Sequence, residues 1–359
     1  MFIKQIIAKS FRNFDDLNLE LNDSRIFIKG VNGSGKTNIL ELVYFLSRCK
    51  PFKAHNEDAL IKIGSNEANI YLKFEKDKEE HSLSSIITKR KKVFAYDDEK
   101  VNKLTSIFGQ LITISYIPKS VYLFKSEPAE KRSFIDEMCS MINYQYLETL
   151  QRYRKLLKER NQAFIKDYDQ DIINVYAEQL IPLAKYIVCF RNQILEKINP
   201  LLQKYYSQMF GSSDIKLVYK TNCPLVEDES LFKEQMIKQF NDNKTNEHLK
   251  KQTLYGPHRD SFFVLIDGKD IASYGSQGQN RLATLSLNLA KKDIYSEFLH
   301  QEPILLLDDV ISDLDEKRII SLLEAVKNSK QVIITGSTNS NLLKEYKTYE
   351  IQNGKIIKE

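Results

Sequence analysis

The sequence has no long hydrophobic run. Its most apolar stretch, from Leu180 to Phe190, is short and contains Lys185, whereas a helix that spans a bilayer needs about 20 consecutive apolar residues. The N-terminal residues Met1 to Gln5 lead directly into strand-like sequence and have neither the basic segment nor the apolar core of a signal peptide. These absences argue against a membrane-spanning or exported protein, and we expect a cytoplasmic one.

Cysteine is also scarce. The four cysteines, Cys49, Cys139, Cys189 and Cys223, lie far apart, with no C-x-x-C pair and no histidine at a spacing typical of zinc sites. We therefore expect free thiols in a reducing compartment, and neither a disulfide scaffold nor a structural metal site.

Charge of one sign is not in large excess either. The chain carries 53 Lys and Arg against 48 Asp and Glu, a net charge of +5 over 359 residues. So mild a balance leaves a nucleic-acid partner open without indicating one. The hydrophobic content of 42% is enough for real cores, which excludes disorder for most of the chain.

The chain has no internal repeat and no low-complexity tract, so its organisation must come from changes in hydrophobic period. Residues 1–118 show short strand patterns around one helix, residues 119–250 show the longer period of helices, and strand patterns return in residues 251–359. We predict an α/β fold in which an inserted α-helical arm, 119–250, divides a head formed by the other two segments.

A glycine-rich sequence follows the apolar strand pattern Ile26 to Ile28. It fits the P-loop pattern G-x-x-x-x-G-K-[ST], and apolar residues recur at helical spacing after it, from Ile39 to Leu46. In such a loop the backbone N–H groups and the helix N-terminus bind phosphates, the lysine reaches the β- and γ-phosphates, and the hydroxyl binds Mg²⁺. The predicted nucleotide site comprises Gly30, Val31, Asn32, Gly33, Ser34, Gly35, Lys36 and Thr37, with Thr37 as a metal ligand.

A second carboxylate site follows the apolar run Ile304 to Leu307, which has the composition of a buried parallel strand. Asp308, directly after it, is the candidate metal ligand, and Asp309 would face the γ-phosphate and orient or deprotonate the attacking water. Taken alone, the pair fits a helix cap or loop about as well. The predicted catalytic residues are Lys36, Asp308 and Asp309.

Two further segments indicate the class of P-loop protein. The segment 243–246 lacks the aspartate of a guanine clamp, which disfavours GTP. The segment Tyr274 to Gln279 resembles the signature loop of ATP-binding-cassette (ABC) ATPases, and Ser276, Gly278 and Gln279 would form a second anion site at a helix N-terminus. It lies one helix upstream of Asp308, and Ser312 to Asp315 resembles the D-loop of that superfamily. The resemblance implies an ABC-type head in which the signature of one subunit covers ATP held by the P-loop of another.

Over nearly its whole length the chain resembles the RecF family of bacterial recombination and repair ATPases. The matching segments are Phe11–Phe14, Gly33–Asn38, Lys131–Asp136, Glu159–Asn161, Glu178–Leu180, Gly256–Asp260, Ser276–Gln279, Leu307–Val310 and Ser312–Asp315. A long coiled-coil member of the SMC group would need many more heptads. A transporter cassette would carry a histidine after the Val332 strand, where this chain has the hydroxyls of Thr335, Ser337 and Thr338.

The resemblance implies roles that the residues alone do not show. It brings Arg12 and Asn13 to the nucleotide, with ATP and Mg²⁺ as cofactors. It implies an ATP-dependent homodimer on duplex or gapped DNA that acts with RecO and RecR to load RecA. It also implies a weak, DNA-stimulated ATPase activity whose hydrolysis step releases the DNA. Asp309 is one methylene shorter than the glutamate usual in ABC ATPases, which favours slow hydrolysis.

Two basic clusters are candidates for DNA contact. The first contains Lys89, Arg90 and Lys91, and the second contains Arg152, Arg154 and Lys155, followed by Lys158, Arg160 and Lys166. Either cluster taken singly fits a solvated face as well. Since phosphate contacts require only positive charge, any binding through them should be salt-sensitive and independent of sequence.

Two alternatives remain at this stage. The chain could be the ABC subunit of another complex, such as a transporter, or a scaffold in which ATP is purely structural. Neither accounts for both the arm and the Gly256 to Asp260 segment.

Overall fold

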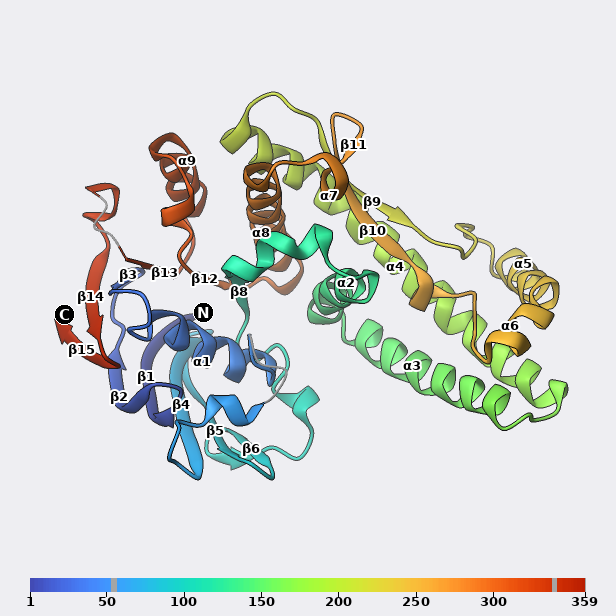
Figure 1. Cartoon of the computed structure of the whole chain (residues 1–359), viewed down its shortest axis with the longest axis horizontal. Coiled ribbons are helices and arrows are strands. Elements are labelled where there is room, and N and C mark those ends of the chain that lie inside the picture. The colour runs from blue at the N-terminus through green and yellow to red at the C-terminus, as the bar shows by residue number, and fades with distance from the viewer. Residues whose placement is uncertain (53–56, 338–340, 359) are drawn as a thin grey trace. The chain divides into compact units, whose positions relative to one another are not determined.

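The computed structural model describes residues 1–52, 57–337 and 341–358 (Figure 1). The chain divides into two compact units. The first contains Met1–Val121, Gln208–Phe210 and Lys291–Glu359, and the second contains Tyr122–Ser207 and Gly211–Ala290. The three-part domain division at residues 118 and 250 stays a prediction.

A mostly parallel six-stranded sheet carries the glycine-rich loop of the first unit. Its order is β15-β14-β3-β13-β12-β8, and all neighbours pair in parallel except β14 and β15. The strands are β3 (Arg25–Lys29), β8 (Thr113–Tyr116), β12 (Ile304–Leu307), β13 (Val332–Gly336), β14 (Lys347–Gln352) and β15 (Lys355–Lys358). Because β13 pairs with both β3 and β12 in parallel, the carboxyl ends of β3 and β12 lie at the same edge of the sheet.

The second sheet of this unit is antiparallel, with the order β2-β1-β4-β5-β6-β7. Its strands are β1 (Phe2–Phe11), β2 (Phe14–Glu20), β4 (Glu67–Lys76), β5 (Glu79–Thr88), β6 (Lys92–Tyr96) and β7 (Glu99–Lys100). Helix α1 (Lys36–Arg48) contacts β8 and β13 of the first sheet and β4 and β5 of the second. It is therefore apolar on more than one face, and the helix after the glycine-rich loop is held in the core from both sides.

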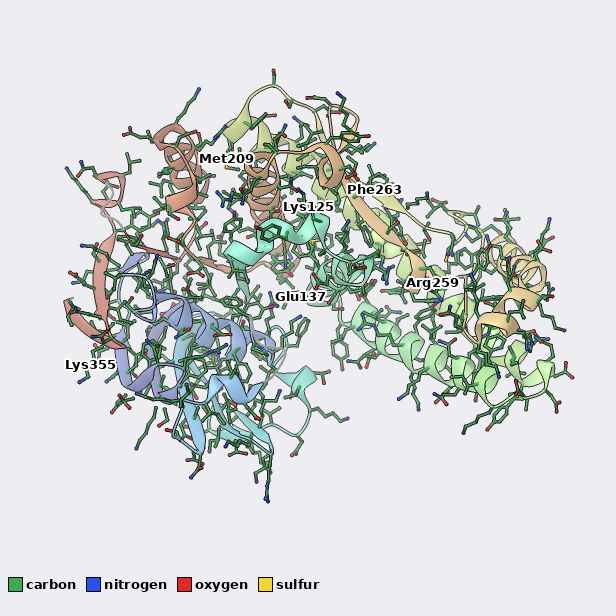
Figure 2. All side chains as sticks on the ribbon, in the orientation of Figure 1. Lys125, Glu137, Met209, Arg259, Phe263 and Lys355 are labelled. Carbon is green, nitrogen blue, oxygen red and sulfur yellow. The ribbon has the colours of Figure 1, made fainter. Side chains whose placement is uncertain are left out.

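The second unit is mainly helical. Its helices are α2 (Pro128–Ile142), α3 (Tyr144–Ile165), most of α4 (Gln170–Phe210), α5 (Glu229–Asp242), α6 (Lys244–Lys250), α7 (Ile271–Tyr274) and the first part of α8 (Gln277–Leu299). Polar side chains project along the length of α3 (Figure 2). The first unit also contains α9 (Glu316–Val326) and the C-terminal part of α8. Within the described residues, none of the helices has the length and apolar character that crossing a membrane requires.

The predicted helical arm also contains one strand. Strand β9 (Ile215–Lys220) lies within it and pairs antiparallel with β10 (Ser261–Ile266), which in turn pairs with β11 (Lys269–Asp270). The partner of β9 is some 40 residues away in sequence, from Lys220 to Ser261. A short strand of this kind is fixed by its distant partner and leaves little periodic signal of its own.

The four cysteines are free thiols; Cys49, Cys139 and Cys223 are buried and Cys189 is half-buried. Burial raises the pKa of the Cys49 thiol to about 11, so that it stays protonated near neutral pH.

Candidate functional site

The loop between β3 and α1 has the backbone conformation that its glycines permit. Gly33 and Gly35 have φ values of +81° and +116°, in the left-handed region that L side chains rarely adopt. A Cβ atom on Gly35 would also lie 2.8 Å from the Asn13 amide nitrogen. The loop therefore requires glycine at position 35 for two independent reasons.

Several polar groups of this loop have no backbone hydrogen-bond partner in the described structure, and they are the reason why the loop fits a polyphosphate. Among the described residues, Ser34 Oγ is buried without a hydrogen-bond partner, and the backbone N–H groups of the buried residues Gly35 and Lys36 have no backbone acceptor. Buried donors without partners cost free energy, and phosphate oxygens at a helix N-terminus would supply the acceptors. The residues present fit a nucleotide phosphate group.

Lys36 lies across the loop and is almost fully buried. Its Nζ donates to the carbonyl oxygens of Gly30 at 2.6 Å and Val31 at 3.0 Å. Burial lowers the pKa of the Lys36 amine, while the charges of Asp309 and Asp308 act to raise it. The amine is thus held at the mouth of the loop, close to two carboxylates.

Thr37 and Asp308 meet, as the sequence predicts for a shared metal site. Thr37 Oγ1 lies 2.9 Å from one carboxylate oxygen of Asp308 and 3.0 Å from the other. Asp308 is only 2% exposed and directly follows β12. A hydroxyl and a carboxylate side by side are hard oxygen ligands of the kind that Mg²⁺ prefers. The pair fits a divalent cation.

The hydroxyl of Thr335 fills the space between the two aspartates. Thr335 Oγ1 donates to Asp308 Oδ1 at 2.7 Å and accepts from the backbone N–H of Asp309 at 3.0 Å. The parallel register of β12 and β13, in which Leu307 is level with Ile334, places it there. Of the two hydroxyls named above that the structure describes, Thr335 and Ser337, Thr335 contacts the carboxylate site. Thr338 lies outside the described residues.

Asp309 has a left-handed backbone, with a φ of +51°. For a residue with a side chain this conformation costs of order 1 kcal/mol, and such strain gathers at functional sites. This left-handed turn changes the direction of the chain directly after β12, so that the side chains of Asp308 and Asp309 have different orientations. Such an arrangement suits a metal ligand followed by a residue that orients water.

Arg12 and Asn13 occupy different positions relative to the loop. Asn13 Nδ2 donates to the Ser34 carbonyl at 3.0 Å, and Asn13 Oδ1 accepts from Asn38 at 2.8 Å, so Asn13 braces the loop. The Arg12 guanidinium forms a bidentate pair with the fully buried Glu41 of α1, both hydrogen bonds being 2.8 Å long. A contact of Arg12 with the nucleotide stays a prediction. Sequence reasoning missed Glu41, whose only signal is a carboxylate among apolar helix positions.

The signature segment belongs to the second unit and forms a capping box at the start of α8. The backbone N–H of Gln279 donates to Ser276 Oγ at 3.1 Å, and the backbone N–H of Ser276 donates to Gln279 Oε1 at 2.8 Å. Gly278 lies in the same first turn and is exposed. The two side chains hold each other in place at a helix N-terminus open to solvent, and their role in anion binding stays a prediction.

Lys89, Arg90 and Lys91 form the exposed turn between β5 and β6, which Thr88 closes through hydrogen bonds to the backbone of Lys91. On α3, Arg152 and Lys155 are exposed. Arg154 donates to Asp136 at 2.9 Å although 59% of its side chain is accessible. The two clusters lie in different units, and DNA contact through them stays a prediction.

Arg160 does not belong to the basic face in which the sequence placed it. It is 2% exposed, and its guanidinium pairs with Glu247 at 2.7 Å and donates to Thr253 at 2.8 Å. The rings of Phe164 and Phe240 lie 4.9 and 4.7 Å from it. The reason is the helical period, since Tyr153, Arg160 and Phe164 share the inner face of α3. An arginine on that face cannot contact a phosphate.

Fold and loop together define the head of an ABC-type P-loop protein. The chain belongs to the family described as RecF/RecN/SMC N terminal domain, whose sequence profile matches residues 2–357. It is 33% identical over 370 residues to the DNA replication and repair protein RecF of Clostridium botulinum strain Eklund 17B, covering 99% of this chain and 100% of that one. It is 31% identical over 369 residues to the protein of the same name from Lactobacillus johnsonii, covering 99% of each.

Solved structures agree with the sequence relatives. The recombination mediator protein RecF-ATP in the RecFOR pathway matches with a TM-score of 0.90 and 27% identity, over 99% of this chain and 96% of that one. An Smc head bound to the C-winged helix domain of ScpA matches with a TM-score of 0.60 at 14% identity, over 99% of this chain and 97% of that one, which shows the fold alone. The predicted fold class and the resemblance to the RecF family are confirmed.

Proposed function

We propose that this chain is an ATP-dependent DNA-binding ATPase of replication and recombinational repair. The observation that carries the proposal is the contact of Thr37 with Asp308 and of Asp308 with Thr335, beside a glycine loop whose buried donors lack acceptors. The relatives named as DNA replication and repair proteins, and the RecF-ATP structure, support the same reading.

In the proposed hydrolysis of ATP, each residue of the site has its own role. The backbone N–H groups of the loop and the Lys36 amine bind the phosphates, and Thr37 with Asp308 would hold Mg²⁺, which screens the negative charge of the reacting phosphate. Asp309 orients the attacking water and accepts its proton. Its side chain is short for that role, so the water is held imperfectly and turnover is slow.

ATP would also act as a bridge between two copies of the chain. Ser276 and the first-turn amides of α8 offer donors at a helix N-terminus but belong to a different unit from Lys36 and Asp308. In the proposal, the signature of one copy covers the γ-phosphate held by the other. Binding of ATP thus favours the dimer, and hydrolysis releases it from DNA.

The proposed DNA partner is a duplex, gapped, or carrying a single-strand to double-strand junction. The exposed residues Lys89, Arg90, Lys91, Arg152 and Lys155 supply positive charge without any means of reading sequence. In this proposal the protein works in the cytoplasm with RecO and RecR to load RecA at gapped DNA, which the RecFOR pathway named for the solved relative supports.

Sedimentation of the full chain with ATP, ADP and a gapped duplex tests the proposal. We expect dimers with ATP and monomers with ADP. Lys36→Arg should abolish the ATP-driven dimers, because the longer, planar guanidinium does not fit a loop built around a buried amine. Asp309→Asn should keep the dimers and block their release, because the amide cannot accept the proton.

Three results would contradict the proposal. Dimers indifferent to both substitutions would show that ATP does not bridge two copies. Phosphate release absent even with DNA would leave a scaffold with structural ATP. Co-purification with a membrane partner in place of DNA would favour a transporter subunit.

A further inference from the structure

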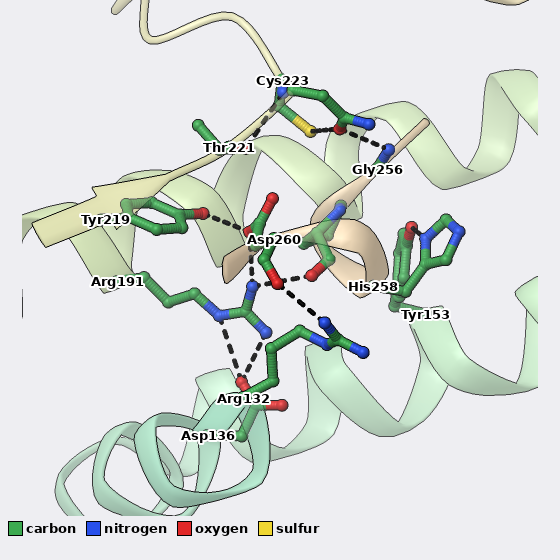
Figure 3. A network of polar contacts seen from close by, with 12 residues as sticks. Arg132, Asp136, Tyr153, Arg191, Tyr219, Thr221, Cys223, Gly256, His258 and Asp260 are labelled. Carbon is green, nitrogen blue, oxygen red and sulfur yellow. Dashed lines mark hydrogen bonds and ion pairs between the residues drawn. The ribbon is translucent and has the colours of Figure 1, made fainter. Parts of the chain in front are cut away.

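Two segments that the nucleotide site does not use come together in the second unit. Residues 131–136 lie in α2 and residues 256–260 precede β10, and Arg191 of α4 joins them (Figure 3). Its guanidinium lies 2.7 Å from Asp136 and 2.6 Å from Asp260, and it donates to the Pro257 carbonyl at 2.9 Å. Arg191 is 1% exposed and all three of its guanidinium nitrogens donate hydrogen bonds, so its role is to hold the two segments together.

A cavity of about 280 Å³ lies against this cluster. Ala129, Leu150, Leu157 and Pro257 give it apolar walls. Its polar lining comes from Arg132, Ser133, Asp136, Tyr153, Arg154, Arg191 and His258. The lining contains three guanidinium groups and one carboxylate, that of Asp136. When the carboxylate of Asp260, which pairs with Arg191, is counted as well, the cluster still has a net positive charge. The volume suits a small ligand.

Arg132 uses few of its hydrogen-bond donors. Within the part of the chain that the structure describes, it makes one hydrogen bond, from Nη1 to the Asp260 carbonyl at 2.7 Å. A guanidinium has five N–H donors. Burial, and then the charge of Arg191, lower the pKa of Arg132. A half-buried, under-bonded cation beside another cation is unfavourable, and an anion in the cavity would relieve both costs.

Arg154 and Ser133 supply further donors at the same wall. Arg154 donates through Nη2 to Asp136 at 2.9 Å, which leaves its other nitrogens available. Ser133 is exposed and lines the same cavity, where its hydroxyl can donate a hydrogen bond. Asp136 does not oppose an anion strongly, because Arg154, Arg191 and the Tyr146 hydroxyl all bond to its carboxylate.

His258 closes the cavity as a neutral ring. Its Nε2 lies 3.0 Å from the Thr253 carbonyl, which can only accept, so the proton is on Nε2. Nδ1 therefore accepts from the Tyr153 hydroxyl at 2.7 Å. Burial lowers the pKa of His258 to about 4, so the positive charge of the cavity at neutral pH comes from arginine.

We propose that this cavity is a second phosphate site, separate from the glycine loop, which takes the phosphate group of a phosphomonoester. Arg132 and Arg154 bind the phosphate oxygens, since guanidinium forks match that geometry, and Ser133 donates one further hydrogen bond. The apolar walls contact the rest of the ligand. Position 256 must be glycine, because a Cβ atom there would clash with the Tyr153 hydroxyl that orients His258.

The test follows the ring signals of His258 by NMR in the full chain, assigned with His258→Gln, while inorganic phosphate is added against potassium chloride of equal ionic strength. Lys36→Ala serves as the background, so that the glycine loop binds phosphate weakly. We expect a saturable shift of the His258 signals with phosphate alone. Equal shifts with chloride or acetate, or no shift, would overturn the proposal.

Variants assign the effect to the cavity. Arg132→Gln should weaken phosphate binding about tenfold or more, and Arg132→Lys should weaken it less, because it keeps the charge and loses the fork. Lys131→Gln is the matched control, since Lys131 neighbours Arg132 and does not line the cavity. Should Arg132→Gln fail to fold, Arg154→Gln tests the second ligand from a largely exposed position. A response that survives both arginine changes would overturn the assignment.

Two oligonucleotides identify the source of the phosphate. If a 5′-phosphorylated strand shifts the His258 signals more strongly than both its 5′-hydroxyl form and inorganic phosphate, the ligand is a strand end. A response to inorganic phosphate that neither oligonucleotide matches would support a free phosphate compound. Both results leave the glycine loop and the proposed ATPase function untouched, so failure here and failure there can be distinguished.

Discussion

Thr335 donates a hydrogen bond of 2.7 Å to Asp308, from the neighbouring strand, although the two residues are 27 positions apart in the sequence. The same hydroxyl accepts the backbone N–H of Asp309. One side chain thus holds the carboxylate of Asp308 and the backbone of Asp309, the two candidate catalytic residues.

Replacement of Thr335 should therefore affect stability and activity together. Thr335→Val keeps the shape but removes one of the two hydroxyls that bond to Asp308 Oδ1 and the side-chain acceptor of the Asp309 backbone N–H, and we expect a loss of about 1–3 kcal/mol in the free energy of unfolding. Urea denaturation and phosphate release measure the two effects. Thr335→Ser is the control and should behave nearly as the original. Equal stability of the Val and Ser variants would contradict the prediction.

We expect Arg160 to stabilise the folded protein and not to bind DNA. Arg160→Leu leaves the buried Glu247 carboxylate without its partner, and we expect about 3–5 kcal/mol of destabilisation in denaturant unfolding. Lys158→Gln, at an exposed position of the same helix, should change stability by less than about 0.5 kcal/mol. If Arg160→Leu unfolds like the original chain yet binds DNA more weakly, this assignment is wrong.

His258 should make stability depend on pH. Its pKa is about 4 in the folded protein and about 6.5 in an unfolded chain, so between these values the unfolded state binds the extra proton. Stability from this group is complete above about pH 6.5 and falls as the pH drops towards 4, by roughly 3 kcal/mol in all.

His258→Gln isolates that contribution. Glutamine can still accept from Tyr153 and donate to Thr253, while every other titratable group, including Asp260 with its raised pKa, is common to both proteins. The difference in the free energy of unfolding between the two should shrink from pH 7 to pH 4. A difference that is constant over that range would rule out a depressed pKa.

Gly256 should tolerate no side chain. Its φ is +131°, and the Cβ of Gly256→Ala would clash with the Tyr153 hydroxyl. We expect a loss of at least about 1–3 kcal/mol, seen as a lower melting temperature. Gly268→Ala is the control, because Gly268 has a φ of +76° and open space around its missing Cβ, so it reports backbone strain alone. Equal losses at both positions would show that the clash is relieved.

Local sequence determined the nucleotide half of this protein well. Strand β12 has the bounds of its apolar run, strand β3 extends its run by one residue at each end, and the two aspartates and the loop follow these strands directly. These features are contiguous, and each depends on residue types that the backbone or the phosphate chemistry restricts. An unbroken apolar run of three or four residues, followed by a glycine-rich loop or a pair of aspartates, favours a buried strand over most other structures.

Tertiary structure decided everything that joins distant segments. The sequence could not show that Thr335, out of three hydroxyls, would lie beside Asp308, because strand register sets this. The sequence pattern placed Arg160 on a charged, solvent-exposed face. It could not show that the guanidinium pairs with a buried carboxylate 87 residues away. It identified the segments 131–136 and 256–260 without relating them. Periodicity tells which side of a helix is buried, but only packing tells what lies against it, since that partner is chosen by the whole chain.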